Sequence, residues 1–311
     1  MASTNTVTQT SDNVSGEARI MSNVILETDI FNKFQIVPAV RDKFRMWNGS
    51  VSDDMIQDYS DNPTETGTTT LNDQEFTIAK KSIFHGVAYD IFKDTEFNVS
   101  INNIKDQGLP QPFVDMVAEL VGKKAAKFAA QDIYNGNGGQ TGDPTGGVDG
   151  IAHLVKDKLT AASLTNRIIT DATNDPTTSA GVKAALDLMK AQFSVDMVEM
   201  KDEFVLLMNG VVNDAWYEYL SGVAATNIPQ DSSLKYQNYN IEIAKGLSSR
   251  RIIMCKKENI NVSLAVTGDL LSLDIVDQYS LGQGNKARAV GNYGYGVGVA
   301  TEDFVIFEFT A

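Results

Sequence analysis

The chain has 311 residues, of which 42% are hydrophobic and 21% charged, and its 40 acidic against 26 basic residues give a formal net charge of −14. This length allows one large domain or two, with a substantial core. Proteins that grip nucleic acid usually present clustered lysine and arginine. The acidic balance therefore argues against sequence-specific nucleic-acid binding.

No apolar run approaches the ~20 residues that span a bilayer, so we expect no membrane partner. The polar N-terminus has neither the basic nor the apolar region of a secretory signal. The single cysteine, Cys255, cannot form an intrachain disulfide. A reducing cytoplasm or a particle indifferent to redox state suits such a chain.

The first third of the chain predicts an arm followed by extended structure. Residues 1–20 are rich in serine, threonine and asparagine and predict a flexible arm. Residues 48–67 are acidic and turn-rich, and residues 68–92 partly alternate between apolar and polar. A long two-stranded excursion over 48–82 cannot bury a core by itself, so we expect it to lie on something else.

The clearest local prediction is a long helix over residues 111–134, because two prolines precede and open it. At ~1.5 Å per residue it would be ~33 Å long. Interspersed alanines would allow close approach to a neighbouring element. Lys123 should point away from the apolar stripe. The expected buried face consists of large apolar residues at helical spacing: Phe113, Val117, Leu120, Val121 and Phe128.

The region after this helix begins with six glycines in the twelve residues 136–147. This run lacks the G-K-[ST] of a phosphate-binding loop. Strands or loops are expected up to about residue 173. Next come a helix over 180–193, a strand over 204–209 and a helix over 213–220. The remainder is expected to be mostly β-strand.

The sequence contains no convincing catalytic or metal-binding constellation. His85 and His153 have no cysteine or histidine at ligand spacing. Residues 282–287 match the form G-x-G-x-x-A, but a dinucleotide site needs a strand directly before it. Residues 272–281 look more helical than extended. We therefore expect no enzyme activity, no cofactor and no metal.

The order of these parts resembles the major capsid proteins of tailed bacteriophages, whose fold is shared with herpesvirus shell floors and bacterial nanocompartment shells. The features that carry the resemblance are the polar arm, the β excursion, the long helix ending in IYNGNG, the DPTGGVDGI segment, the strand and helix FVLLMNGVVNDAWYEYL, and the two C-terminal strands. It covers roughly residues 20–311 and rests on element order more than on invariant residues.

The resemblance implies an α+β fold with five parts. These are an N-terminal arm (1–45), an extended loop (46–85), a peripheral domain (86–202) with a spine helix at 111–134, an axial domain (203–285), and C-terminal strands that return to the peripheral domain (286–311). It also implies assembly contacts from the glycine-rich loop, at Gly138, Gly139, Asp143, Pro144, Gly146 and Gly147.

The implied function is that of a structural subunit, which self-assembles through hexamers and pentamers into an icosahedral capsid around double-stranded DNA. Assembly would occur in the host bacterial cytoplasm. The chain lacks a long charged helical extension at its start, so a separate scaffolding protein or a processed precursor is implied. A portal and decoration proteins are further expected partners. Lys80 and Lys81 lie near the end of the extended loop, but no residue set matches the covalent cross-linking of some relatives.

Two alternatives remain open at the sequence level. The first keeps the fold but gives it another use, as a nanocompartment shell around a cargo enzyme. The second is an acidic cytoplasmic nucleotide-binding enzyme whose loop is residues 282–287.

Overall fold

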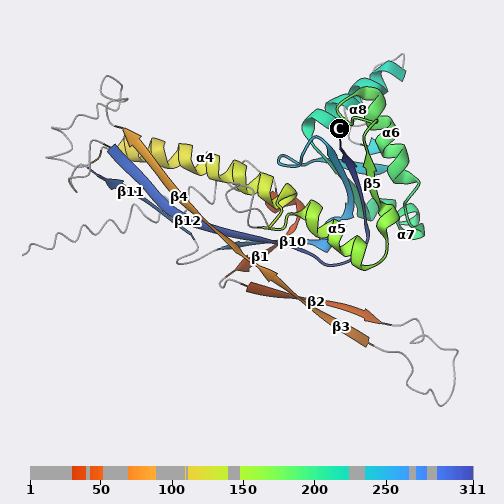
Figure 1. Cartoon of the computed structure of the whole chain (residues 1–311), viewed down its shortest axis with the longest axis horizontal. Coiled ribbons are helices and arrows are strands. Elements are labelled where there is room, and N and C mark those ends of the chain that lie inside the picture. Colours follow the sequence, from red (N-terminus) through yellow and green to blue (C-terminus); the bar gives the residue numbers. More distant parts are fainter. Residues whose placement is uncertain are drawn as a thin grey trace, which may run out of the picture.

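The computed structural model describes residues 30–39, 43–51, 69–88, 109, 111–138, 148–223, 235–265, 271–278 and 286–310. Their strands form a five-stranded, a six-stranded and a two-stranded sheet. Figure 1 shows a long lobe in which helix α4 lies along the five-stranded sheet, a compact lobe around the six-stranded sheet, and a hairpin that extends away from both. The expected α+β class is confirmed. Within the described ranges, no helix is both long and apolar enough to cross a membrane.

The long lobe is organised around strand β12 (Lys286–Val299). One edge of β12 pairs antiparallel first with β11 (Leu271–Asp277) and then with β10 (Ile260–Ala265). The other edge pairs antiparallel with β4 (Ala79–Ala88). β1 (Gln35–Ala39) adds a parallel strand to β10. A single 14-residue strand thus joins segments that are far apart in the sequence.

The projecting hairpin consists of β2 (Lys43–Val51) and β3 (Thr69–Thr77), which pair antiparallel along their whole length. A two-stranded hairpin alone is marginally stable in water. The prediction of a β excursion is confirmed, but its range of 48–82 is too long at its C-terminal end. Residues from 79 onward pair with β12 instead, so the extended loop expected over 46–85 stops short of β4.

The predicted long helix is confirmed as α4 (Gln111–Asn135). Phe113 and Val117 are buried, whereas Val121 and Phe128 are only partly buried. Leu120 is 59% exposed, so its assignment to the buried face is wrong. The reason is that small residues form much of the buried side of α4, where the helix packs closely against the rest of the chain. These small residues are Ala118, Gly122, Ala125, Ala126, Ala129 and Ala130.

The compact lobe has a six-stranded sheet in the order β5-β13-β9-β6-β8-β7. Alternate residues of β6 face opposite layers: Phe204 and Leu206 join the core under the helices α6 and α8, and Val205 and Leu207 join the core shared with α5. The strands are β5 (Ile168–Asp171), β6 (Phe204–Met208), β7 (Lys235–Tyr236), β8 (Tyr239–Ile243), β9 (Arg251–Lys256) and β13 (Phe304–Phe309).

The helices cover both faces of this sheet, which is why β6 is a continuous apolar run. Helix α5 lies between the two lobes (Figure 1). It packs into a hydrophobic core that contains residues of both sheets. Besides α4, the helices are α2 (Ile30–Lys33), α5 (Ile151–Ala161), α6 (Ser179–Lys190), α7 (Val195–Glu199) and α8 (Gly210–Val223), with short 3₁₀ turns at Thr165–Arg167, Lys201–Glu203 and Lys257–Asn259.

Three expectations from the sequence require correction. Helix α5 occupies a region where strands or loops were expected, and β11 is a strand where a helix seemed better. The domain ranges 86–202 and 203–285 do not separate the sheets, because β5 belongs to the compact lobe and β10 and β11 to the long one. Of the C-terminal strands expected to return to the peripheral domain, β12 packs against α4. β13 pairs with β5, inside the expected range 86–202, and with β9, outside it.

The contrast between Phe113 and Leu120 gives a test of how α4 packs. Phe113 is fully buried against Ala287 and Ala289 of β12 and Leu273 of β11. Phe113→Ala should therefore lower the free energy of unfolding of the unassembled subunit by ~3–5 kcal/mol. Leu120→Ala, the matched control on the same helix, should change it by no more than ~0.5 kcal/mol. Urea unfolding measures both, and equal losses would contradict the orientation of α4.

Candidate functional site

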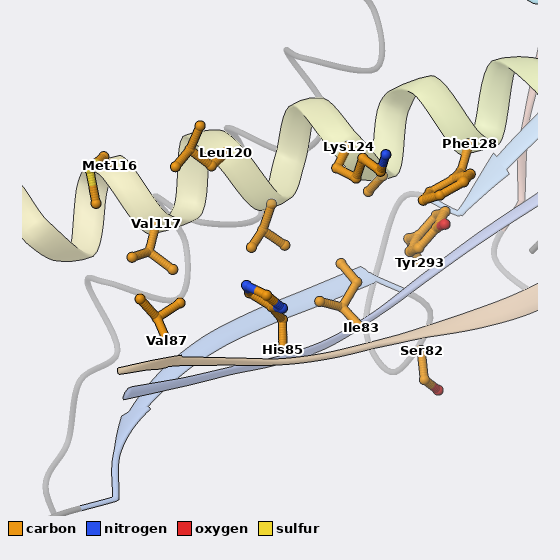
Figure 2. Close-up of a pocket in the computed structure, with 12 residues that line it drawn as sticks. Ser82, Ile83, His85, Val87, Met116, Val117, Leu120, Lys124, Phe128 and Tyr293 are labelled. Carbon is orange, nitrogen blue, oxygen red and sulfur yellow. The ribbon is translucent and has the colours of Figure 1, made fainter. Parts of the chain in front are cut away.

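A groove of about 520 Å³ lies between α4 and the five-stranded sheet. Figure 2 shows Val117 of α4 above Val87 of β4, and His85 and Ile83 pointing towards the helix. Phe128 of α4 and Tyr293 of β12 line the same groove. The lining is apolar over most of its area. Its residues are Ser82, Ile83, His85, Val87, Met116, Val117, Leu120, Val121, Lys124, Ala125, Phe128 and Tyr293.

The polar groups of this groove do not form a reacting set. The ammonium of Lys124 lies 4.9 Å from the centroid of the Phe128 ring, a cation–π arrangement. Burial raises the pKa of Tyr293 to about 12, so its hydroxyl stays protonated at neutral pH. On the opposite side of β4, Phe84 is 69% exposed. The long lobe thus offers apolar surface on both sides of β4, which is typical of surfaces that bind other proteins.

A buried carboxylate lies near the C-terminal end of α4. Asp132 is 0% exposed and accepts a hydrogen bond from the hydroxyl of Tyr295 on β12. The ammonium of Lys81 on β4 lies 3.5 Å from the same carboxylate. A buried charge needs such partners because its desolvation is costly. The three side chains thereby tie α4 to the two neighbouring strands β12 and β4, and Lys81 is engaged in this ion pair.

The last residue of α4, Asn135, connects the helix to the compact lobe. Its side-chain amide donates to the carbonyl oxygen of Gly246, at 2.5 Å, and its side-chain oxygen accepts from the backbone N–H of Ser248, at 3.0 Å. Both partners lie in the connection between β8 and β9. A Cβ at Gly246 would lie 2.6 Å from the carbonyl oxygen of Ala130. The connection therefore lies directly against the α4 backbone.

The contacts of Asn135 continue into an ion-pair network. Arg251 of β9 donates to the side-chain oxygen of Asn135 at 3.4 Å, and its Nε donates to Glu308 of β13 at 2.8 Å. Lys156 of α5 forms an ion pair with the other carboxylate oxygen of Glu308. We call Asn135, Lys156, Arg251 and Glu308 the junction cluster. It joins α4, α5, β9 and β13, and a single sequence carries no signal that would have identified it.

The junction cluster lowers the pKa of the Glu308 carboxyl group. Burial alone would raise the pKa of Glu308, but hydrogen bonds from Lys156 and Arg251 outweigh this effect, and the pKa is held below its ordinary value. Glu308 is therefore ionised at neutral pH and stabilises the folded state there. That contribution is present above the unfolded-state pKa and is lost as the pH falls through the lower folded-state pKa.

The two described ends of the glycine-rich passage lie against each other. The N–H of Gly150 donates to the carbonyl oxygen of Gly136 at 2.9 Å, and the N–H of Gly138 donates to Asp149 at 2.9 Å. A Cβ at Gly150 would lie 2.4 Å from the nitrogen of Gly136, so glycine is required there. Of the predicted assembly contacts only Gly138 is described, and it is exposed. The others lie outside the described residues: Gly139, Asp143, Pro144, Gly146 and Gly147.

The sequence alternatives based on catalysis or nucleotide binding gain no support. His153 lies between Asp149 and Asp157 at 3.6 and 3.5 Å, and no group of three or more potential metal ligands occurs among the described residues. Residues 282–287 come after β11 in the sequence and include the first two residues of β12, and these two strands pair antiparallel. A dinucleotide loop instead joins a strand to a helix whose N-terminus receives the phosphates. The prediction of a helix before this loop is wrong, because β11 is a strand. The loop is followed by another strand, β12, and not by the helix that a dinucleotide site requires.

Comparisons with known proteins show which solved structures share this architecture. No protein-family model and no curated protein match the sequence. Among solved structures, a chain of the satellite phage P4 procapsid is similar at a TM-score of 0.61 and 11% identity, over 99% of this chain and 92% of that one. A chain of Microbacterium phage Oxtober96 gives 0.56 and 10%, over 91% of each. A chain of the capsid of an empty GTA particle gives 0.52 and 12%, over 92% and 90%.

These likenesses extend over nearly the whole length of each chain, so they concern the complete arrangement of lobes. At 10–12% identity they show the fold. The expected resemblance in fold is thereby confirmed. The chain has the fold of chains found in a phage procapsid and in the capsid of a GTA particle.

The junction cluster predicts a pH-dependent difference between wild type and the variant Glu308→Gln. At pH 7 the variant should lose ~1–3 kcal/mol of unfolding free energy, because two cations lose a charged hydrogen-bond acceptor. The difference should shrink as the pH falls below about 4.5, because Glu308 is then protonated in the unfolded chain and, at still lower pH, in the folded one as well. Urea unfolding at a series of pH values measures it.

The control is Glu203→Gln, which removes the carboxylate paired with Lys256 at 2.6 Å. Glu203 is 52% exposed, so this variant should lose no more than ~1 kcal/mol. A Glu308→Gln loss that does not change between pH 7 and pH 4 would contradict the assigned role of the carboxylate.

Proposed function

We propose that this chain is the structural subunit of a viral shell, and that its copies self-assemble into the icosahedral capsid enclosing the double-stranded DNA of a tailed phage. The observation that carries the proposal is the likeness to the P4 procapsid chain, which covers 99% of this chain at a TM-score of 0.61. A match of this extent includes the long lobe, the compact lobe and the projecting hairpin together.

The surface of the chain supports the same conclusion on physical grounds. The β2–β3 hairpin extends away from both lobes (Figure 1) and belongs to a sheet of only two strands. The groove above β4 and the exposed Phe84 below it leave apolar surface to solvent in the single chain. Contacts with neighbouring copies would bury such surface, and stable interfaces typically bury more than ~1,000 Å².

The partners follow from this proposal. Copies of the chain would form hexamers and pentamers, because closed symmetry satisfies every repeated interface. A separate scaffolding protein, a portal and decoration proteins would join the particle, and the net charge of −14 would keep the packed DNA from adhering to the shell. In this role the chain is not an enzyme and binds no cofactor. Assembly would take place in the host bacterial cytoplasm, and the mature location would be the virion.

A nanocompartment shell around a cargo enzyme would use the same fold. The two uses differ in what the shell contains, and the contents of purified particles distinguish them. The phage capsid is preferred because the procapsid likeness covers nearly the whole chain.

The test is to express the chain alone and together with the proposed scaffolding protein. We expect closed, uniform particles in sedimentation and negative-stain microscopy, because the hairpin and groove require neighbours. Particles recovered from infected cells should contain double-stranded DNA. A compact 33.8 kDa monomer under every condition would overturn the proposal, and particles filled with a single enzyme would favour the nanocompartment.

A further inference from the structure

A hollow of about 350 Å³ lies where α4 meets the compact lobe, and two lysines line it. Lys127 comes from α4 and Lys245 from the connection between β8 and β9. Gln131 of α4 and Asn209, which directly precedes α8, contribute amide side chains. The described residues that line the hollow include no aspartate and no glutamate. We call this hollow the lysine cleft.

The positive charge of the lysine cleft is not neutralised by the described part of the chain. Lys127 and Lys245 are both exposed, and neither forms an ion pair with a described residue. Lys33 of α2 donates to the carbonyl oxygen of Ile243, which also lines the cleft, so a third ammonium group lies beside it. Other described lysines have a carboxylate partner on the same molecule: Lys81, Lys123, Lys156, Lys183, Lys256 and Lys257.

The backbone that carries Lys245 is held in place from both sides of the cleft. The side chain of Asn209 donates to the carbonyl oxygen of Leu247 at 2.6 Å. From the end of α4, the side chain of Asn135 bonds to the same connection. The two lysines therefore extend from backbone segments that are fixed relative to each other. Binding a ligand would have to order only their side chains, which lowers the entropy cost of binding.

We propose that the lysine cleft binds a phosphate group. A phosphate group is anionic and has at least two oxygens that accept hydrogen bonds, so a single group can bridge two ammonium groups. The amide of Gln131 adds a neutral donor at the same wall. Helix α8 begins at Gly210 in the lining of the cleft, and the partial positive charge of its N-terminus adds to that of the lysines.

Two sources could supply this phosphate group: the backbone of DNA, or a free phosphate such as pyrophosphate. The inference goes beyond the proposed function and does not rest on it, because the cleft lies within a single chain. With a net charge of −14, most of the remaining surface should repel phosphates. We therefore expect one site per chain.

The experiment titrates the full chain with sodium pyrophosphate at constant ionic strength, followed by isothermal titration calorimetry. Wild type should bind one pyrophosphate per chain. Lys127→Gln with Lys245→Gln should weaken binding at least about tenfold, because both ammonium groups are lost. Lys127→Arg with Lys245→Arg keeps both charges and should stay within about threefold of wild type.

The matched control is Lys190→Gln with Lys235→Gln, which makes the same change in net charge at two exposed lysines outside the cleft. Its affinity for pyrophosphate should stay within about twofold of wild type, because long-range effects of surface charge are screened by salt. Circular dichroism checks that every variant folds.

A second titration, with short double-stranded DNA followed by fluorescence anisotropy, identifies the source of the phosphate. If the source is the DNA backbone, the duplex should bind to wild type. The slope of log K against log salt concentration should then fall by about one for each lysine replaced by glutamine. If pyrophosphate binds and the duplex does not, the site takes a free phosphate.

The proposal is overturned if both probes bind the glutamine double variant as tightly as wild type, or if neither probe binds wild type. These results are independent of shell assembly. A chain that forms no particles but binds pyrophosphate through the two lysines would contradict the proposed function and leave the phosphate site in place.

Discussion

The structure depends on one constraint, the attachment of helix α4 to the compact lobe at Asn135. This side chain bonds to Gly246 and Ser248 of the β8–β9 connection, and through Arg251 it reaches Glu308. An exposed polar contact alone would be weak, but here it lies beside a core shared by both lobes. Helix α5 contributes to that core between the sheets. The angle between the long helix and the six-stranded sheet is therefore set by packing and by directed hydrogen bonds together.

A fixed angle has consequences for a shell. In the proposed shell, copies in hexamers and pentamers would meet neighbours at different angles, and a rigid joint could not absorb that difference. The adjustment must then occur in segments with little support from the rest of the chain. The two-stranded β2–β3 hairpin is such a segment, since it belongs to neither larger sheet. Apolar surface beside β4, in the groove and at Phe84, remains for neighbours to cover.

The sequence predicted those elements whose apolar pattern is local. Helix α4, helix α6, β6 and the C-terminal strands show clear periodicity, and their predicted bounds lie close to the observed ones. Helix α8 was also predicted, but over 213–220, three residues short at each end. Helix α5 was missed although Ile151, Val155 and Leu159 have helical spacing, because the preceding glycines suggested loop. In β11 the alternation of Leu271, Leu273 and Ile275 was similarly present but was interpreted as helix.

The sequence could not predict the tertiary contacts of the chain. The buried side of α4 is set largely by small residues such as Ala125 and Ala129, because the backbone packs closely there, so the large Leu120 faces outward. The domain boundaries failed because β5 belongs to the compact lobe and β10 and β11 to the long one, so that each sheet combines distant segments of the chain. The junction cluster joins residues from 135 to 308, and only the folded chain brings them together.

The most direct test of the account is an electron cryomicroscopy reconstruction of particles formed by the full chain, with each independent copy built separately. The account predicts a closed icosahedral shell in which every copy keeps the same angle between α4 and the six-stranded sheet, with Asn135 bonded to the β8–β9 connection. Differences between copies should be concentrated in the β2–β3 hairpin. Open aggregates, or copies whose lobes rotate about Asn135 while their hairpins stay the same, would contradict it.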